Sequence, residues 1–303
     1  MRSNLSPSGM KRVKAISRLD GFYGEEIRRM MYRFRRNKLS LLGLAWFVVL
    51  TFVAVFAYQL APYPEDASTP HFYEMFKPPS LEHLLGTDEA GRDVLSRIII
   101  GSQISVSTGL LVLLLAVTIG VPAGLASGYV GGALDAFVMR VADVIFSIPP
   151  LVLALCVTVV LTPSLEHSMI AIAFAHWPWY ARIVRGEVLH VKEEGYVEAA
   201  RSLGASTPYI AFMEILPNVL TPIIVRMSLD LGYAILILAA LGFLGLGARP
   251  PTPEWGTIAG VGRVHLPSRW WITTFSGLAI FITVLASNLL GDGLRDALEP
   301  QVE

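Results

Sequence analysis

The sequence predicts an all-helical integral membrane protein that crosses the bilayer six times, and three observations support this fold class. The chain of 303 residues is 53% hydrophobic, with a mean hydropathy of +0.56 and only 16% charged residues, against roughly 25% charged in a typical soluble domain. Residues 39–58 carry no charge, and as a helix they would be about 30 Å long, enough to cross a hydrocarbon core. The apolar runs are continuous rather than alternating, which excludes a membrane β-barrel.

Six apolar stretches are candidates for membrane-spanning helices. In chain order they are residues 39–58, 98–127, 144–162, 168–184, 219–241 and 272–290. The third and fourth are short and contain Pro149, Pro150 and Pro178, which leaves their ends open. Proline frees backbone carbonyls that only neighbouring helices or a lined cavity can satisfy within a bilayer. We therefore expect these two spans inside a helix bundle rather than against lipid.

The distribution of charge predicts the orientation of the chain. Residues 1–38 hold eleven lysines and arginines, whereas residues 61–97 hold three beside seven acidic residues. The positive-inside rule therefore places the N-terminus in the cytoplasm, and six crossings return the C-terminus to the same side. The transmembrane domain is then 39–303, with extracytoplasmic loops at 61–97 and 242–271 and a cytoplasmic loop at 185–218.

The first 38 residues are expected to form a basic cytoplasmic arm. Its second half mixes arginines with Phe22, Ile27, Met30, Tyr32 and Phe34, a pattern typical of a helix lying on the membrane surface and attracted to anionic lipid. A membrane anchor follows immediately, so we expect lipid rather than nucleic acid as its partner.

The second span carries a ladder of small residues. Ala116, Gly120, Gly124 and Gly128 recur at every fourth position, which would let another helix approach closely. We expect Pro122 to kink this helix.

The first outer loop ends in a possible helix start. Thr87 or Asp88 could cap the helix, and Asp93 and Arg97 are one turn apart, as in a helical ion pair. Metal-ligating residue types also occur in this loop, at His71, Glu74 and His83. Their spacing matches no known ligand set, so we predict no metal site.

The cytoplasmic loop contains a polar helix-turn-helix. Residues 198–203 are mostly good helix formers, Gly204 is a natural helix stop, and a second short helix is expected over 207–215 with Pro208 in its first turn. Two alanines after Glu198 present a small surface with one charge, suited to a groove on a partner. An ordinary amphipathic loop helix is the alternative.

The fifth span carries Arg226 and Asp230 at helical spacing. Ionisable groups at that depth are costly, so they should pair and face either the protein interior or a water-filled route. Lining of a substrate path and a self-satisfied structural pair both remain open. His176, beside Trp177 and Trp179, is interpreted as part of an interfacial aromatic belt.

The motifs of enzymes are missing. No phosphate-binding loop is present, since none of the five lysines follows a glycine, and no zinc-protease, nucleophile-elbow or Cys/His motif occurs. The single cysteine, Cys156, excludes an intrachain disulfide. We therefore expect no catalytic residue and no cofactor in this chain.

Taken together, these motifs resemble those of a known family. The Glu198-Ala-Ala segment, Gly204 and the pair Leu216-Pro217 resemble the EAA loop of permease subunits of bacterial and archaeal ABC importers. Residues 86–97, 244–256 and 291–300 are similar to stretches of the dipeptide, oligopeptide and nickel permeases, in particular the second permease of each pair. Glu214 departs from the family pattern, which has isoleucine at that position.

The resemblance implies a fold and a set of partners. The fold would be the six-helix bundle of type I ABC importers, in the plasma membrane of a bacterium or archaeon. The partners would be a homologous permease, two cytoplasmic ATPase subunits that bind ATP and Mg²⁺, and an extracytoplasmic substrate-binding protein that delivers short peptides. The residues implied in ATPase coupling are Glu198, Ala199, Ala200, Arg201, Gly204, Leu216 and Pro217.

Two other functions are considered. A stand-alone secondary transporter or channel would need uptake without ATPase subunits, and a membrane scaffold would leave the helix-turn-helix without a purpose. The sequence leaves the substrate open among dipeptides, oligopeptides, nickel complexes and oligosaccharides, and it does not locate the substrate path.

Overall fold

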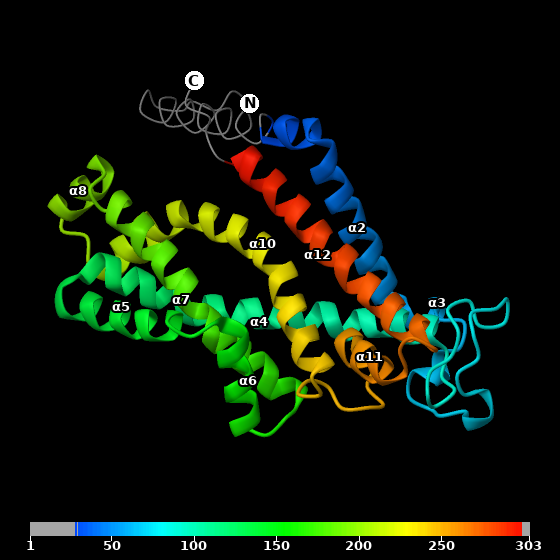
Figure 1. Cartoon of the computed structure of the whole chain (residues 1–303). Helices are drawn as coiled ribbons and strands as arrows, with labels where there is room; N and C mark the ends of the chain where they lie inside the picture. Colours follow the sequence, from blue (N-terminus) through cyan, green and yellow to red (C-terminus); the bar gives the residue numbers. More distant parts are fainter. Residues whose placement is uncertain (1–27, 29, 299–303) are drawn as a thin grey trace, which may run out of the picture.

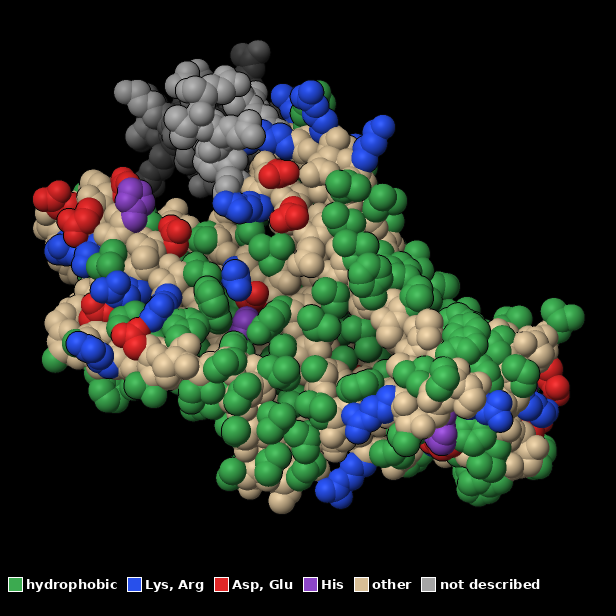
Figure 2. Space-filling view, viewed as in Figure 1, with side chains coloured by type: hydrophobic (Ala, Val, Ile, Leu, Met, Phe, Trp, Pro, Cys, Tyr) green, Lys and Arg blue, Asp and Glu red, His purple; other side chains and the backbone are tan. Residues whose placement is uncertain are grey.

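The computed structural model describes residue 28 and residues 30–298, and within this part the chain folds into helices and connecting loops without a β-strand. The predicted all-helical fold is confirmed. In Figure 1 the helix labelled α8 and the loop that follows α3 lie at opposite ends of the molecule. Figure 2 shows hydrophobic side chains over the middle of one face and most charged side chains towards its ends, the distribution expected of a protein that sits across a bilayer.

The helices follow one another in this order: α2 (Lys38–Val55), α3 (Ala57–Leu60), η1 (Pro64–Ala67), η2 (Phe72–Glu74), α4 (Val94–Val130), α5 (Gly132–Phe146), α6 (Pro150–Val160), α7 (Leu165–Val191), α8 (Gly195–Ser202), α9 (Thr207–Tyr209), η3 (Ile210–Ile215), α10 (Leu216–Phe243), α11 (Trp255–Gly262), η4 (Arg263–His265) and α12 (Trp270–Leu298). Helices α2 and α12 run side by side, and α4 and α10 cross behind and beside them (Figure 1).

Four helical stretches in the described residues are long and apolar enough to span a membrane. They are Lys38–Val55, Val94–Val130, Thr207–Phe243 and Trp270–Leu298. The bent pair α5 and α6 makes a fifth if it is one broken span. The predicted fourth span, 168–184, lies inside α7, which passes unbroken through Pro178 and is not among these four stretches.

The predicted third span, 144–162, is broken at the two prolines that the sequence analysis singled out. Helices α5 and α6 meet at an angle of 90°, and the break lies between Phe146 and Pro150. Proline has no N–H to donate, and it forces the residue before it into an extended conformation. Pro149 accordingly has φ −53° and ψ 130°. The two adjacent prolines therefore end one helix and start the next in a new direction.

The predicted small-residue ladder is confirmed, and its partner is α7. A side chain at Gly120 would come within 2.5 Å of the Trp177 carbonyl oxygen, and one at Gly124 within 2.4 Å of the Ala181 oxygen. Only glycine allows backbones to approach this closely. This contact brings α7, and with it the start of the 185–218 loop, against the 37-residue helix α4.

The outer loop starts α4 differently from the prediction. Asp93, rather than Thr87 or Asp88, caps the helix, since its side chain accepts from the Ser96 amide at 2.8 Å. Arg97 pairs with Asp88 at 2.8 Å and not with Asp93, because a chain reversal through two left-handed glycines brings Asp88 back over the helix.

The second outer loop is only partly irregular. Of the loop expected over 242–271, residues 244–254 form no helix, but α10 extends to Phe243 and α11 follows at Trp255. Glu254 caps α11 by accepting from the amides of Gly256 and Thr257 at 2.8 and 2.7 Å. Its burial raises the pKa of its carboxyl group. The Trp255 indole donates to the Ile98 carbonyl at 2.9 Å, which ties α11 to α4, and Arg97 at the end of the first outer loop donates to the Pro251 carbonyl of the second at 3.3 Å.

The two described ends of the chain meet. Residues 30–36 are helical, whereas residues 1–27 and 29 of the predicted basic arm lie outside the described residues. Asn37 caps α2 by accepting from the Leu39 amide at 3.1 Å, and it donates to the Asp296 carboxylate near the end of α12 at 3.3 Å. Both ends of the described chain are therefore on the same side of the molecule.

Candidate functional site

Helix α8 stands at one end of the molecule as a short surface helix with a single buried anchor. Val197 is fully buried, and it belongs to the same hydrophobic cluster as Ile210 and Ile215 of η3. Tyr196 accepts a hydrogen bond from the Asn218 side chain at 3.0 Å, which ties α8 to the first turn of α10. These contacts hold α8 against the following helix and turn its other residues outward.

The turn after α8 has the geometry predicted for Gly204. Its φ is +83°, a left-handed conformation that glycine adopts without strain. The Gly204 amide donates to the Arg201 carbonyl at 3.0 Å, and the Ala205 amide donates to the Ala200 carbonyl at 3.1 Å. This pair of bonds is the Schellman motif, which satisfies the last carbonyls of a helix. A side chain at Gly204 would meet nothing within 4 Å, so the tip projects into open space.

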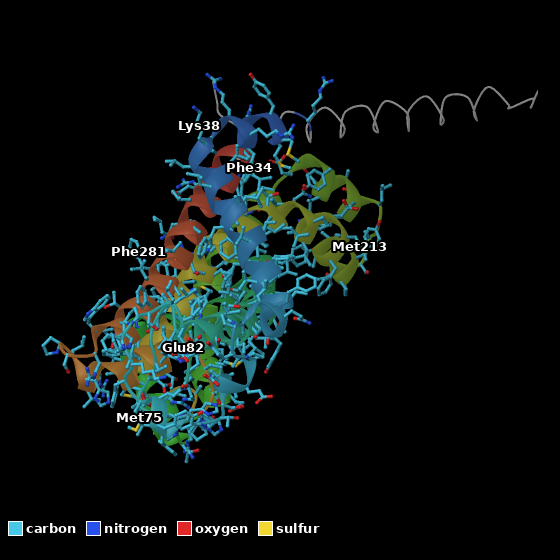
Figure 3. The ribbon with its side chains drawn as sticks, turned by 90° about the vertical axis from the view of Figure 1, so that its right-hand side faces the viewer. Phe34, Lys38, Met75, Glu82, Met213 and Phe281 are labelled. Carbon is cyan, nitrogen blue, oxygen red and sulfur yellow. The ribbon has the colours of Figure 1, made fainter. Side chains whose placement is uncertain are left out.

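The outward face of this loop carries unpaired charge and apolar side chains. Glu198, Ala199 and Arg201 are exposed, and no described residue pairs with either charged side chain. Leu203, directly before the glycine turn, is 88% exposed. Phe212 and Met213 on the following helix are also exposed, and Met213 lies at the outer edge of the molecule in Figure 3. Sequence reasoning missed these three apolar residues, although the position of Leu203 at a helix C-cap was a signal.

We define the α8 surface as Glu198, Ala199, Ala200, Arg201, Leu203, Gly204, Phe212 and Met213. Large apolar side chains that protrude beside unpaired charges at the end of a membrane domain are typical of a site for another protein.

The second helix of the 185–218 loop is longer than predicted. A separate helix over 207–215 was expected, but the chain stays helical from Thr207 to Phe243, and it widens into a π-helix at η3. Pro217 has no N–H to bond the Met213 carbonyl, and a local π-helical turn accommodates such a gap without ending the helix. The predicted site residues Leu216 and Pro217 therefore lie in the first turn of α10, half-buried and exposed respectively, rather than at the tip. The backbone carbonyl of Glu214 accepts from Asn218 at 2.7 Å.

The predicted pair in the fifth span forms, and it extends into a buried cluster. Arg226 donates through Nε to Asp230 at 2.9 Å, and its Nη2 lies 2.9 Å from the second carboxylate oxygen. The Tyr180 hydroxyl donates to the same carboxylate at 3.0 Å, and the His176 Nε2 lies 3.1 Å from it. His176 is 3% exposed, so its interpretation as part of an interfacial belt is wrong. The bend of α10 across α7 is what brings these side chains together.

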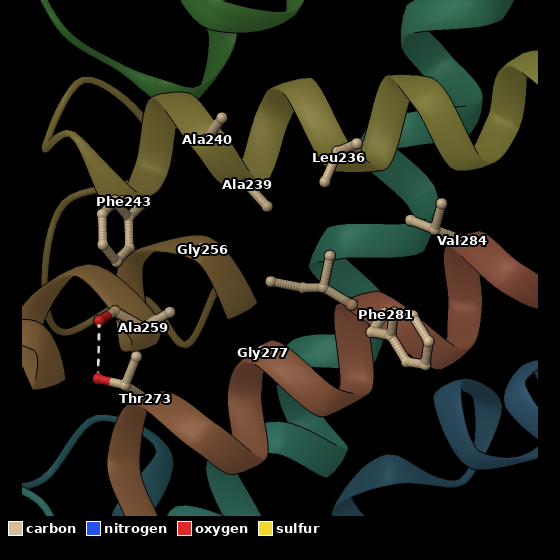
Figure 4. A pocket seen from close by; sticks show the side chains of 11 residues that line it. Leu236, Ala239, Ala240, Phe243, Gly256, Ala259, Thr273, Gly277, Phe281 and Val284 are labelled. Carbon is tan, nitrogen blue, oxygen red and sulfur yellow. Dashed lines mark hydrogen bonds between the residues drawn. The ribbon is translucent and has the colours of Figure 1, made fainter. Parts of the chain in front are cut away.

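Two hollows, each of about 430 Å³, lie against α10. One is formed with α11 and α12 and is almost entirely apolar, with Phe243 and Phe281 in its lining (Figure 4). The Thr273 hydroxyl, which also lines it, donates to the Ala259 carbonyl at 3.2 Å. The other hollow lies between α7, α10 and α12, and Glu187, Arg226 and Arg295 line it. Only the second hollow offers charged groups to a polar solute.

The outer loop gathers a different set of metal-ligating side chains from the one considered in the sequence. Glu74, Glu82 and His83 lie together, whereas His71 pairs with Asp66 at 3.0 Å. The Lys77 ammonium lies 2.9 Å from Glu74 and 3.7 Å from Glu82, and its hydrogen bond lowers the pKa of the Glu74 carboxyl group. A cation of the protein itself thus already neutralises this group, and we assign no metal to it.

Comparison with protein-family models gives two matches. Residues 120–303 match the model described as binding-protein-dependent transport system inner membrane component. Residues 26–79 match the N-terminal transmembrane domain of oligopeptide transport permease C.

Curated relatives match over most of their length. The dipeptide transport system permease protein DppC of Haemophilus influenzae is 41% identical over 90% of this chain and 94% of its own. The probable D,D-dipeptide transport system permease protein DdpC of Escherichia coli is 41% identical over 90% and 91%. The glutathione transport system permease protein GsiD of Escherichia coli is 42% identical over 89% of each chain. Among solved structures, a chain of the MetNI methionine ABC transporter in an inward-facing conformation superposes with a TM-score of 0.55, 19% identity and coverage of 67% and 97%. At this identity the superposition shows the fold alone.

Proposed function

Because this chain belongs to the family of binding-protein-dependent transport system inner membrane components, we propose that it is one of two permeases in an ATP-driven importer of short peptides. The named relatives support the substrate class, since dipeptides and glutathione are all short peptides. The proposed partners are a homologous permease, two cytoplasmic ATPase subunits and an extracytoplasmic substrate-binding protein. ATP and Mg²⁺ would be bound by the ATPase subunits, with no catalysis in this chain.

The proposed topology has six crossings in a bacterial inner membrane. Helix α2 with α3, α4, the bent pair α5 and α6, α7, α10 and α12 would each cross once. The contact between Asn37 and Asp296 supports an even number of crossings, because both ends lie on one side. The eleven lysines and arginines of residues 1–38 favour the cytoplasm for that side. The joined outer loops would then face the substrate-binding protein.

The α8 surface is the proposed docking site for an ATPase subunit. The single observation that supports this most strongly is the exposure of Leu203 beside unpaired Glu198 and Arg201, at the end opposite the outer loops. Burial of a leucine side chain in a partner's groove is worth about 1.5–3 kcal/mol. The left-handed turn at Gly204 keeps the Leu203 side chain exposed to a partner. Leu216 and Pro217 would position the helix that follows the turn. Movement of the ATPase subunits could then be transmitted through α8 to α7 and α10.

Arg226 and Asp230 are proposed to face the transport path. The Arg226 side chain is 32% exposed on a helix that is otherwise apolar enough to span the membrane. A guanidinium group that faced lipid at this depth would cost several kcal/mol. Such a residue is stable if its exposed side faces water between two permeases.

Co-purification from native membranes tests the proposal directly. We expect this chain to retain a second permease and two ATPase subunits, and we expect the complex, with its binding protein, to hydrolyse ATP faster when a dipeptide is added. Peptide uptake that persists after deletion of the ATPase subunits would instead support a secondary transporter. A chain that purifies without nucleotide-hydrolysing partners and gives no uptake would contradict both functions.

A further inference from the structure

The polar hollow between α7, α10 and α12 has the composition of a site for a small charged solute. Its volume of about 430 Å³ is within the range of small-molecule sites, roughly 300–1,000 Å³. Apolar side chains such as Ile183, Val225 and Leu229 form much of its wall. Two cations and one anion are placed among them: Arg226, Arg295 and Glu187. The site therefore combines an apolar wall with charges of both signs.

Arg226 is held as a fixed anion-binding group. Asp230 engages its Nε and Nη2, and the Trp179 ring lies 4.9 Å from the guanidinium carbon. No described residue accepts a hydrogen bond from Nη1, so this amino group remains for an additional acceptor. A planar guanidinium that is already oriented loses little entropy when it binds a carboxylate. The burial of Asp230 keeps this orientation, because its carboxylate is 4% exposed and held from three sides.

Glu187 provides the opposite charge on the facing helix. It lies on α7, it is partly buried, and no described residue forms a hydrogen bond or ion pair with it. A carboxylate on an apolar wall gains most from a cation that arrives with a solute, because the local dielectric constant is lower than that of water. Within this hollow, Glu187 is thus suited to an ammonium group and Arg226 to a carboxylate.

We propose that this hollow binds both ends of a zwitterionic peptide, with the carboxylate at Arg226 and the ammonium group at Glu187. The proposal rests on the function proposed above and adds a subsite to it. The lining residues of the hollow include Thr221 near the start of α10 and Leu298 at the end of α12. These helix ends lie in the same half of the molecule as α8 (Figure 1). The subsite is therefore on the cytoplasmic half of the path, where it selects for free peptide termini after the binding protein has released the substrate.

Transport of three related peptides by the whole importer tests this subsite. The complex of both permeases, the ATPase subunits and the binding protein is reconstituted in proteoliposomes, and uptake of alanyl-alanine is compared with uptake of its C-terminal amide and of its N-acetyl form. The binding protein is the same in every preparation, so its own preference cancels when a variant is compared with the wild type. Glu187→Gln should lower the preference for alanyl-alanine over the N-acetyl form about tenfold, the loss expected for one charge-assisted hydrogen bond.

A double variant tests the proposed contact between the peptide carboxylate and Arg226. Arg226→Gln with Asp230→Asn removes both charges and so avoids an unpaired buried carboxylate. It should lower the preference for alanyl-alanine over its amide about tenfold. Arg182→Gln is the matched control, because Arg182 lies on the same helix as Glu187 but pairs with Asp143 outside the hollow.

The outcomes separate the subsite from the proposed function. If wild type imports alanyl-alanine with ATP hydrolysis but neither variant changes its preference, the subsite is wrong and the proposed function remains. If wild type shows no ATP-driven uptake, both are wrong. A loss of uptake by the double variant that is equal for all three peptides, with an unchanged Glu187→Gln preference, also overturns the subsite, because a purely structural role predicts that result.

Discussion

Substitution of Gly204 tests the central role of the turn after α8. The φ of +83° lies in a region that costs other residues about 1–2 kcal/mol, and the cost is greatest for β-branched side chains. No atom lies within 4 Å of the position that a Cβ would occupy, so steric clash adds nothing. The free-energy cost of a substitution therefore comes from the backbone conformation. The cost is confined to the turn, because the hydrophobic cluster around Val197 is unchanged.

The expected effect is graded by residue type. Asparagine tolerates the left-handed conformation, alanine tolerates it less well, and valine least. We expect Gly204→Val to reduce the population of the native turn by about 5- to 30-fold, the ratio that corresponds to 1–2 kcal/mol. ATP hydrolysis should then be uncoupled from uptake, whereas insertion into the membrane should be normal. Gly204→Asn should be close to wild type, with Gly204→Ala between the two.

The assay is the number of peptides imported per ATP hydrolysed in proteoliposomes that contain the complete importer. Gly195→Ala is the matched control, since it adds a methyl group to the same helix, meets nothing within 4 Å and has no left-handed backbone. Two results would refute the reasoning. One is wild-type coupling in Gly204→Val, and the other is equal impairment by asparagine and valine, which would show that backbone conformation is not the cause.

Three further predictions concern other parts of the molecule. Leu203→Ala should weaken retention of the ATPase subunits at least tenfold on purification, because a leucine buried on docking contributes about 1.5–3 kcal/mol. Leu81→Ala is the control and should leave retention unchanged, because Leu81 is 98% exposed at the other end of the molecule. Asp88→Asn should destabilise the outer loops by about 3–5 kcal/mol, because it leaves the buried Arg97 without its counter-ion; a melting temperature equal to wild type would contradict this. Burial raises the pKa of Glu254, so the folded state binds a proton more readily than the unfolded state, and its contribution to stability is lost as pH rises through the raised pKa. The melting temperature of wild type should therefore fall relative to that of Glu254→Gln as the pH rises above the ordinary glutamate pKa of 4.5. Parallel profiles for the two proteins would refute the assignment.

The helical fold and the turn after α8 could be predicted because each depends on local chemistry. Long apolar runs can satisfy their backbone only as helices in a membrane, and a glycine after a row of helix formers ends a helix in the left-handed conformation. The spacing of Gly120 and Gly124 indicated a close helix contact, but it did not identify α7 as the partner. A small residue in a helix indicates only that another helix packs closely against it. Which helix that is depends on the path of the whole chain.

The errors occurred where a residue's effect depends on its surroundings. Pro149 and Pro150 broke a predicted span, whereas Pro178 and Pro217 did not end their helices. The side chain of Asn218 supports the helix beside Pro217 by donating to the Glu214 carbonyl. Propensity alone does not distinguish a proline that kinks a helix from one that ends it.

The sequence by itself determined that this protein is a helical membrane protein of the permease family, with a short polar helix-turn-helix between two apolar spans. Hydrophobicity, charge asymmetry and glycine conformation act over a few residues, and the order of the residues is enough to recognise them. Only the tertiary structure decided which charges meet. Asp230 lies 54 residues from His176 in the chain, and yet the crossing of α7 and α10 brings their side chains to 3.1 Å. Packing over such separations depends on the combined shape of many side chains, which no short segment specifies.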